Sequence, residues 1–473
     1  MAGFHVENFG CRAARADGEA IGGQLLASGH CMQQPSDAAV VVVNTCSVTA
    51  EADRAARAFI RKAHRENPEA KIVVTGCYAQ RAPQELAGMA GVAAVVGNSH
   101  KALAPEIIAG LAGGQTDTAA PADLVGVGAL LSGGNHVPIW VDDRFAHSFL
   151  EEAQVVHGTQ TRPNLKIQEG CGNRCTFCVI PYTRGSSKSL PHAVVLRQVE
   201  SFVAAGGNEL VLSGINLGRW GRDFSVPASF AGLLREILEQ TALPRLRLSS
   251  IEPMDWDAEL ISLMAEFGGK RLARHAHLPL QSGSDAVLRR MHRRYRPWHY
   301  AEKVAALAKA AGPELTLGAD VMVGFPGETN AEFEDTLAMV RSLPFGYLHL
   351  FPFSPRPGTR GWALHVESPV SPRVVEERMA VLRTLAAQKS AAHRKCFIGR
   401  ELDAITLHTP DVVAARNRTM ALTENFLPVE IAGTIAANRL VRVRVAGLTA
   451  EGSLAALSMT GSRDQYEATA MSV

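Results

Sequence analysis

The sequence predicts an α/β chain built in three parts. Its first third repeats a strand, a cysteine and a helix at intervals of about one β/α unit, which is typical of a Rossmann-like domain with a parallel sheet. The middle carries six strand–helix repeats, which favour a parallel, partly closed barrel. Short β runs near the end indicate a small all-β module. We expect domains at 1–111, 158–390 and 391–460, with 112–157 as a Gly-, Ala- and Pro-rich linker.

In the first third, three short β-type runs are each followed by a cysteine, and two of them continue into helical sequence such as Glu51–His64. The runs and their cysteines are Val6–Phe9 with Cys11, Val40–Val43 with Cys46, and Ile72–Thr75 with Cys77. Parallel strands end at one edge of a sheet, where open α/β sheets bind ligands, so we expect the three cysteines to converge there. The alternative is three buried apolar thiols, because free cysteine is often a core residue.

The barrel and the last module are predicted from β-type runs and the helical sequence between them. The six barrel strands are expected at Leu165–Gln168, Glu209–Ser213, Arg245–Ser250, His275–Leu280, Ala319–Val323 and Tyr347–Phe351. Helices are expected at Ala193–Ala205, Phe230–Gln240, Tyr300–Ala311 and Ala331–Leu343. The C-terminal strands are expected at Leu402–Leu407, Val429–Ile431 and Leu440–Val445. Active sites of such barrels lie at the carboxyl ends of the strands.

Composition narrows the class of protein. With 47% hydrophobic and 20% charged residues, the chain reads as an ordinary globular protein. A formal net charge of +2 means that any nucleic-acid binding depends on local patches. No apolar run is long enough for a membrane span, and the N-terminus does not resemble a secretory signal, so we expect a cytoplasmic protein. Eight cysteines are then expected to be reduced and metal-bound rather than paired in disulfides.

The most informative stretch is the loop Cys171-Gly-Asn-Arg-Cys175-Thr-Phe-Cys178, which follows the first barrel strand. Three thiolates on a [4Fe–4S] cluster leave one iron open for chemistry. The alternative is a structural zinc site, which needs four protein ligands. His192 is the nearest following candidate for a fourth ligand, and no second Cys/His pair follows it. The spacing therefore favours a cluster.

An open-iron cluster at the mouth of a six-unit β/α barrel resembles the radical S-adenosylmethionine (SAM) superfamily. In that superfamily the open iron binds the amino and carboxylate groups of SAM, and one electron splits the cofactor to give a 5′-deoxyadenosyl radical. Such a radical removes hydrogen from unactivated C–H bonds, a reaction that the cofactor rather than protein groups supplies.

Together, the two cysteine triplets resemble those of the radical SAM methylthiotransferase family, over nearly the whole chain. The matching stretches are Phe9–Cys11, Asn44–Thr49, Gly76–Gln80, Lys166–Gly185, Ser213–Gly218, Leu278–Ser284, Gly324–Thr329 and Phe351–Pro355. The resemblance implies a radical-generating cluster on Cys171, Cys175 and Cys178, and an auxiliary cluster on Cys11, Cys46 and Cys77. It also implies that the C-terminal module is an RNA-binding barrel of the TRAM type.

Within this family the substrate differs between branches. Arg247–Pro253 resembles the branch that methylthiolates N6-threonylcarbamoyladenosine in tRNA, at position 37 beside the anticodon. The branch acting on N6-isopentenyladenosine usually has Thr/Ser-His-Pro there, and we keep it as the second candidate. The branch acting on an aspartate of a ribosomal protein tends to carry Gln-His where this chain has Gln281-Ser282. The segment Arg12–Arg15 departs from the family's Asn-Gln motif, so we expect altered surroundings of the auxiliary cluster, not altered ligands.

Further site residues are expected beside the clusters and at the barrel mouth. Glu209, Ser249, Glu252 and Gln281 are candidates for SAM binding, and Tyr182, Arg184 and Asp320 for catalysis. His275 and His277 alternate on a strand and are interpreted as packing residues because a third metal ligand is missing. Leu288–Tyr300 interleaves cations with aromatics, which suits single-stranded RNA.

The resemblance implies a tRNA anticodon stem-loop as substrate and a flavodoxin or ferredoxin as electron donor. Two alternatives from other classes are an iron–sulfur electron carrier or redox sensor, and a non-catalytic RNA-binding protein. A simple carrier closes its clusters with four cysteines, so two open triplets argue against it.

Overall fold

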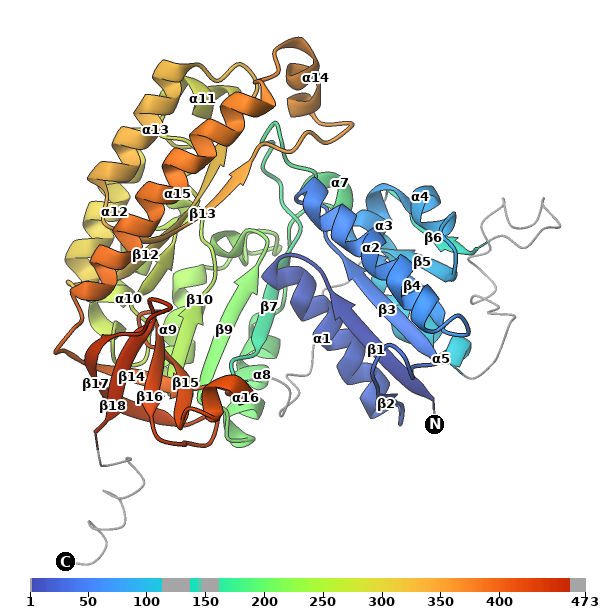
Figure 1. Cartoon of the computed structure of the whole chain (residues 1–473), viewed down its shortest axis with the longest axis horizontal. Helices are drawn as coiled ribbons and strands as arrows, with labels where there is room; N and C mark the ends of the chain where they lie inside the picture. Colours follow the sequence, from blue (N-terminus) through green and yellow to red (C-terminus); the bar gives the residue numbers. More distant parts are fainter. Residues whose placement is uncertain (1, 113–136, 144, 146–160, 460–473) are drawn as a thin grey trace, which may run out of the picture. The chain divides into compact units, whose positions relative to one another are not determined.

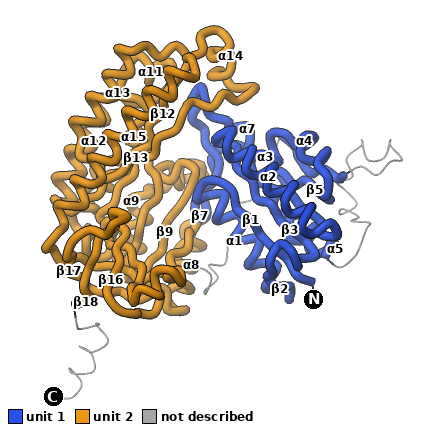
Figure 2. Tube along the Cα trace, viewed as in Figure 1, with its two compact units in different colours: residues 1–155, 166–190 blue, residues 156–165, 191–473 orange. Residues whose placement is uncertain are grey.

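The computed structural model of the chain describes residues 2–112, 137–143, 145 and 161–459 (Figure 1). It divides into two compact units (Figure 2). Unit 1 comprises residues 1–155 and 166–190, and unit 2 comprises residues 156–165 and 191–473. Among the described residues, no helix is both long and apolar enough to cross a membrane.

Unit 1 is built on a parallel sheet with the strand order β2-β1-β3-β4-β5-β6 (Figure 1). Its strands are β1 (Gly3–Asn8), β2 (Cys31–Met32), β3 (Val40–Thr45), β4 (Lys71–Gly76), β5 (Val92–Gly97) and β6 (Ile139–Trp140). The helices are α1 (Arg12–Ala27), α2 (Ala50–Glu66), α3 (Cys77–Arg81), α4 (Pro83–Ala87), the 3₁₀ helix η1 (Asn98–Leu103) and α5 (Ala104–Ala112). The start of this order, 2-1-3-4-5, is that of a flavodoxin-like doubly wound sheet.

Both faces of this sheet are covered, which explains why β3 is apolar throughout. Val41 and Val43 belong to a core that includes Ile60 of α2. Val40 and Val42 belong to a second core, on the face covered by α1 and α5. Alternate side chains of one strand thus enter different cores, and β3 carries no polar stripe over these four residues.

The segment that returns to unit 1 carries the second cysteine loop. Strand β7 (Asn164–Glu169) begins in unit 2 and continues into unit 1. The loop then leads into α7 (Ile180–Arg184) and β8 (Lys188–Ser189), which pairs antiparallel with the end of β7. This division does not follow the expected domain boundaries, because residues 166–190 group with the N-terminal sheet.

Unit 2 contains the remaining parallel strands of the β/α barrel. They are β9 (Glu209–Gly214), β10 (Arg245–Leu248), β11 (His275–His277), β12 (Thr316–Val323) and β13 (Phe345–Pro352). Strand β9 pairs with β10, and β12 pairs with both β11 and β13. Parallel bridges between Leu246 and Leu272, and between Ser250 and His277, join the two groups.

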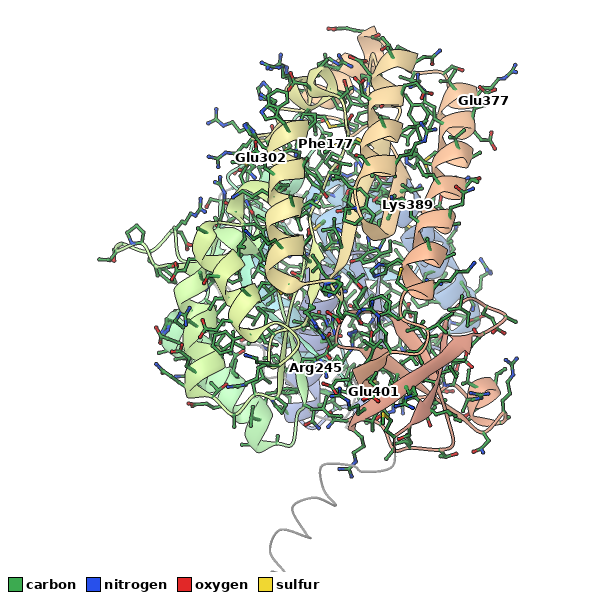
Figure 3. The ribbon with its side chains drawn as sticks, turned by 90° about the vertical axis from the view of Figure 1, so that its left-hand side faces the viewer. Phe177, Arg245, Glu302, Glu377, Lys389 and Glu401 are labelled. Carbon is green, nitrogen blue, oxygen red and sulfur yellow. The ribbon has the colours of Figure 1, made fainter. Side chains whose placement is uncertain are left out.

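Helices connect the parallel barrel strands, as is typical of right-handed β/α crossovers. They are α8 (His192–Ala204), α9 (Phe230–Gln240), α10 (Ala258–Phe267), α11 (Asp285–Arg290), α12 (Pro297–Ala311), α13 (Asn330–Ser342), α14 (Arg360–Glu367) and α15 (Pro372–Lys395), with the 3₁₀ helices η2 (Leu217–Arg219) and η3 (Pro253–Asp255). In Figure 3, Glu302 marks α12 and Glu377 and Lys389 mark α15, which leads into the C-terminal barrel.

The C-terminal module is a closed barrel of five strands in the order β14-β15-β16-β18-β17. Its elements are β14 (Glu401–Thr406), α16 (Asp411–Ala414), β15 (Arg418–Thr423), β16 (Pro428–Ala432), β17 (Leu440–Leu448) and β18 (Leu454–Ser458). Closure removes the exposed strand edges of this small sheet.

The predicted parallel sheet, parallel barrel and small β-barrel are therefore confirmed. Most of the expected linker 112–157 lies outside the described residues. The described part includes β6, which pairs with β5, so these residues extend the sheet rather than only connecting domains.

One turn of the C-terminal barrel, Thr423–Leu427, lies against the amino ends of the β/α-barrel strands. Its Thr423 carbonyl accepts a hydrogen bond from Arg247 Nη2 at 3.2 Å, and Glu424 accepts from Arg274 Nε at 2.8 Å. Arg245, which labels this end of the barrel in Figure 3, is the first residue of β10. The turn thus covers the end of the barrel opposite to the carboxyl ends of its strands.

Phe426 is the apolar part of this turn. Its ring centroid lies 4.4 Å from that of His275 and 5.6 Å from that of Tyr347, and the Arg247 guanidinium lies 5.3 Å from the ring. Phe426 has a left-handed backbone, with a φ of 70°. This costly conformation is maintained because the ring is held by contacts on several sides.

Replacing Phe426 with Ala is expected to lower the stability of unit 2 by about 2 kcal/mol, less than for a fully buried phenylalanine because the ring is only partly enclosed. Calorimetry of the full chain would measure the loss. Leu457→Ala is the control, because Leu457 is 56% exposed on the same barrel and should change stability by less than about 0.5 kcal/mol. Equal transitions for the two variants would contradict this role of the turn.

Candidate functional site

The three N-terminal cysteines lie at the carboxyl edge of the unit 1 sheet. Cys11 caps the start of α1 after β1, Cys46 directly follows β3, and Cys77 begins α3 after β4. Helices α1 and α2, which follow the neighbouring strands β1 and β3, pack on opposite faces of the sheet. The gap between them is the topological switch point, where doubly wound sheets bind ligands.

The thiols lie close enough to change one another's protonation. The Cys46 thiol donates a hydrogen bond to the Cys11 sulfur, and this bond is the main reason that the Cys11 pKa falls to about 6. The same bond, together with burial and the charges of Cys11 and Cys77, raises the Cys46 pKa well above its usual value. The structure thus brings together three thiols that were 66 residues apart in sequence at most.

Two glycines make this close approach possible. A Cβ added to Gly10 would lie 2.4 Å from Cys46 Sγ, and one added to Gly76 would lie 2.3 Å from the Thr45 carbonyl oxygen. Both glycines also have a positive φ, which other residues rarely adopt.

Cys77 accepts hydrogen bonds from two side chains that are themselves anchored. Asn98 Nδ2 lies 3.4 Å from Cys77 Sγ and also donates to the Thr183 carbonyl at 2.8 Å. Arg184 Nε lies 3.2 Å from the same sulfur. N–H donors to cysteine sulfur are typical surroundings of an iron–sulfur cluster, so this set of donors and thiols suits such a cluster.

Arg184 also belongs to a buried group of five charged side chains, which we call the ion cluster. Its members are Asp17 of α1, Lys101 of η1, Lys166 and Glu169 of β7, and Arg184 of α7. Each is at most 8% exposed. Arg184 Nη1 donates to Asp17 Oδ2 at 2.9 Å and to Glu169 Oε1 at 2.6 Å, and both lysines contact both carboxylates.

The carboxylates of the ion cluster are held in their charged form. Burial raises the pKa of Glu169, but the ammonium groups of Lys101 and Lys166 outweigh it and bring the pKa to about 2. The pKa of Asp17 is lowered for the same reason, again against the opposing effect of burial. Charges so deeply buried are tolerated only because each has partners of opposite sign.

The second cysteine loop is fixed at its entry. The Cys171 amide donates to the Gly185 carbonyl at 3.1 Å. Gly170, with a φ of 69°, lies against the backbone of Ser186, and an added Cβ would lie 1.9 Å from the Ser186 carbonyl oxygen. Within the loop, Asn173 N donates to Cys171 Sγ at 3.4 Å. The entry to the loop is therefore tied to the segment that immediately follows Arg184.

The zinc alternative gains no support from the geometry. His192 forms an ion pair with Glu236 at 2.8 Å, both within unit 2. Across the described residues, the one group of three metal-ligating side chains with all ligand atoms within 4.8 Å is His277, Asp320 and His349. Neither cysteine triplet is that compact, whereas the ligands of a single zinc ion must be.

His277, Asp320 and His349 form a polar row on neighbouring strands of unit 2. Asp320 Oδ1 lies 3.1 Å from His277 Nε2 and 3.3 Å from His349 Nδ1. The Tyr347 hydroxyl lies 3.0 Å from His277 Nδ1 and 2.8 Å from His275 Nε2. Both histidines do share a face, but the expectation that His277 has no further metal-ligating neighbours is wrong. Hydrogen bonds from the two imidazoles lower the pKa of Asp320 against the effect of burial.

The expected position of Glu209 at the barrel mouth is also wrong. Glu209 is the first residue of β9, at the amino end, and is fully buried among arginines. Its carboxylate pairs with Arg162 at 3.2 Å and Arg247 at 2.7 Å, and the three arginines Arg162, Arg245 and Arg247 lower its pKa against the effect of burial. Glu209 is thus a structural anion below the barrel.

The other three SAM candidates lie beyond the carboxyl ends of strands. Ser249 and Glu252 follow β10, and Gln281 follows β11. Glu252 forms an ion pair with Arg293, and Gln281 has a left-handed backbone with a φ of 62°. Asp320 lies within β12, not at its end. The structure thus places Ser249, Glu252 and Gln281 on the edge where such barrels carry their active sites.

Tyr182 and Arg184 are two residues apart but differ completely in solvent exposure. Tyr182 is 65% exposed, whereas Arg184 is fully buried in the ion cluster. The contact of Arg184 with Cys77 could not be read from the sequence, because it joins positions 107 residues apart.

Leu288–Tyr300 is partly structural, because two of its aromatic residues belong to the core and cannot stack on RNA bases. Tyr295 and Tyr300 are fully buried and donate hydrogen bonds to backbone carbonyls of 278–280. Arg290 pairs with Glu332, as Arg293 does with Glu252. Trp298, which is 51% exposed, remains available on the surface. RNA contact by the exposed residues of this segment stays a prediction.

Two protein-family models match the chain, one over the N-terminal cysteines and the other over the second cysteine loop and the barrel. The family described as "Radical SAM superfamily" matches residues 165–340, and "Uncharacterized protein family UPF0004" matches residues 3–97. A solved structure of the radical S-adenosylmethionine methyltransferase TsrM from Kitasatospora setae has a TM-score of 0.55 at 16% identity, covering 76% of this chain and 77% of that one. The fold and the cysteine loop thus define a radical SAM enzyme.

Named relatives are similar over most of the chain. "Threonylcarbamoyladenosine tRNA methylthiotransferase MtaB" from Aquifex aeolicus is 34% identical, covering 93% of this chain and 99% of its own. The protein of the same name from Bacillus subtilis is 34% identical over 92% of this chain and 91% of its own. "tRNA-2-methylthio-N(6)-dimethylallyladenosine synthase" from Erythrobacter litoralis is 34% identical over 86% of each chain. The chain belongs to the radical SAM methylthiotransferase family, whose cofactors are SAM and [4Fe–4S] clusters.

Changing Glu169 to Gln is expected to destabilise the full-length, metal-free chain by about 3–5 kcal/mol at pH 7, since it leaves three buried cations with one carboxylate. Because folding lowers the Glu169 pKa from 4.5 to about 2, this contribution is complete above pH 4.5 and is lost as the pH falls through about 2. The gap in thermal midpoint between wild type and Glu169→Gln should therefore narrow below pH 4.5.

Glu19→Gln serves as the control for this prediction. Glu19 pairs with Arg15 on the outside of α1, at 3.1 Å, and an exposed pair contributes at most about 1 kcal/mol. A Glu169→Gln gap that stays constant with pH, or that is no larger than the Glu19→Gln gap, would contradict the ion cluster.

Proposed function

We propose that this enzyme converts N6-threonylcarbamoyladenosine in tRNA, at position 37 beside the anticodon, to its 2-methylthio derivative. The observation that carries the proposal is the pair of cysteine triplets in unit 1, each with three thiols for a cluster that keeps one iron open. One site can then generate the radical while the other presents sulfur. An electron carrier needs neither open iron.

The residues fit this division of labour. Cys171, Cys175 and Cys178 would hold the radical-generating cluster, and Cys11, Cys46 and Cys77 the auxiliary one. When both clusters and SAM are bound, they supply hydrogen removal from C2 of the adenine, sulfur insertion at that carbon and methylation of the sulfur. Ser249, Glu252 and Gln281 are proposed to orient SAM from the carboxyl edge of the barrel. The exposed Tyr182, next to the cysteine loop, is proposed to contact substrate or cofactor.

The choice of substrate branch is supported by the relatives and by the segment Arg247–Pro253. The relatives named for threonylcarbamoyladenosine cover 85–94% of this chain, and those named for dimethylallyladenosine cover 84–86%, both at 32–34% identity. Within the segment, Arg247 is fully buried and pairs with Glu209. Any effect on substrate choice is therefore assigned to Ser249 and Glu252, which lie at the carboxyl edge.

The partners proposed are a tRNA anticodon stem-loop and a small electron-transfer protein such as flavodoxin or ferredoxin, in the cytoplasm and away from membranes. Exposed arginines of the C-terminal barrel are suited to phosphate contacts. Arg442 and Arg444 lie side by side on β17 with Glu401 between them, so that two guanidiniums share one carboxylate.

Deleting the gene should remove 2-methylthio-N6-threonylcarbamoyladenosine from tRNA and accumulate its unthiolated precursor, as measured by mass spectrometry of nucleosides. The wild-type gene should restore the product, and Ala at any of the six cluster cysteines should abolish it, because a cluster bound by two thiolates is no longer held. Cys31→Ala and Cys396→Ala are matched controls: both are exposed, outside the triplets, and should retain activity.

Other outcomes would redirect the assignment. Loss of the isopentenyl-derived nucleoside instead would keep the reaction and change the substrate branch. Persistence of both nucleosides, in a strain without a redundant enzyme, would contradict a tRNA substrate and favour the ribosomal protein. Full activity of the Cys46→Ala variant would exclude the auxiliary cluster.

A further inference from the structure

The ion cluster of unit 1 contains one more positive charge than its own carboxylates can balance. Among the described residues, the carboxylates paired with Lys101, Lys166 and Arg184 are those of Asp17 and Glu169, and all five side chains are at most 8% exposed. A buried charge without a counter-charge is strongly unfavourable. An anion beside this group would therefore stabilise it.

Cys77 is the residue of the cysteine site that lies beside this group. Arg184 points its Nη1 at both carboxylates and its Nε at Cys77 Sγ, 3.2 Å away. Asn98 adds a neutral donor to the same sulfur at 3.4 Å. Arg184 is thus the cation of the ion cluster that also contacts a cysteine sulfur.

Arg184 also joins the two cysteine loops. Its partner Glu169 lies two residues before Cys171, a distance of at most about 7 Å along the chain. The next residue, Gly185, accepts a hydrogen bond from the Cys171 amide at 3.1 Å. One side chain and its neighbour thus contact a ligand of the auxiliary site and the start of the radical-generating loop.

We infer that Arg184 is a positioning residue that raises the reduction potential of the auxiliary cluster and fixes Cys77 relative to the Cys171 loop. The inference rests on the proposed auxiliary cluster. Reduction adds negative charge, and a buried guanidinium next to a cluster sulfur stabilises the reduced form. Hydrogen bonds to the sulfur act in the same direction.

The test is a redox titration of the full-length enzyme carrying both clusters, followed by electron paramagnetic resonance. A parallel set of variants with Cys171, Cys175 and Cys178 changed to Ala assigns the auxiliary signal. Arg184→Gln should shift the auxiliary midpoint potential to a lower value. Asn98→Leu, which removes a donor but no charge, should give a smaller shift in the same direction.

Arg184→Lys keeps the charge and should retain most of the wild-type potential. Arg57→Gln is the matched control: it removes an arginine of unit 1 that bonds Tyr78 and Glu85 and touches no cysteine, so the potential should not move. Unchanged potentials in Arg184→Gln and Asn98→Leu, at full iron content, would overturn the inference. If Arg184→Gln loses its iron, a wild-type potential in Asn98→Leu would overturn it.

Failure of the proposed function gives a different result. If the chain with Ala at positions 171, 175 and 178 binds no iron, the N-terminal triplet holds no cluster and the auxiliary role fails. If it binds iron at a potential that the Arg184 and Asn98 variants do not shift, only the role of Arg184 fails.

Discussion

The architecture of unit 1 depends on the buried ion cluster around Arg184. Its five side chains come from α1, η1, β7 and α7, and they join the N-terminal sheet to the segment that carries the second cysteine loop. Apolar packing alone could hold these elements with some freedom. Buried ion pairs with defined geometry fix their register, because every misaligned charge would lose its partner. Both cysteine triplets thereby become parts of one compact unit.

A different constraint shapes unit 2. The turn Thr423–Leu427 closes the amino end of the β/α barrel, and Phe426 contacts His275 and Tyr347 there. Tyr347 in turn contacts His277, which pairs with Asp320. A continuous series of contacts therefore connects the C-terminal barrel with the polar row of His277, Asp320 and His349 on the β/α-barrel strands. The C-terminal barrel is thus in direct contact with the β/α barrel.

Local patterns in the sequence predict the strands well, and they also predict that the three N-terminal cysteines lie at the carboxyl edge of the sheet. The β-type runs before Cys11, Cys46 and Cys77 can be recognised in the sequence because each strand is followed closely by its cysteine. The carboxyl ends of these parallel strands then bring the three cysteines together at the topological switch point. Contacts between distant residues leave no such pattern. Three features depend instead on which elements become neighbours in the fold. They are the pairing of Arg184 with Cys77, the burial of Glu209 at the amino end of β9, and the turn at Phe426. The short strand β6 was missed for the same reason, since its pairing with β5 is what defines it.

The central claim is that one compact unit holds two clusters close together. Arg184 contacts Cys77, and the next residue, Gly185, accepts a hydrogen bond from the Cys171 amide, so we expect reduced clusters on the two triplets to interact magnetically. Pulsed electron paramagnetic resonance of the doubly reduced enzyme measures this most directly, with the variant lacking one triplet as reference. The account predicts broadened spectra and faster spin relaxation when both clusters are present. Two signals that simply add, each identical to that of its single-cluster variant, would contradict it.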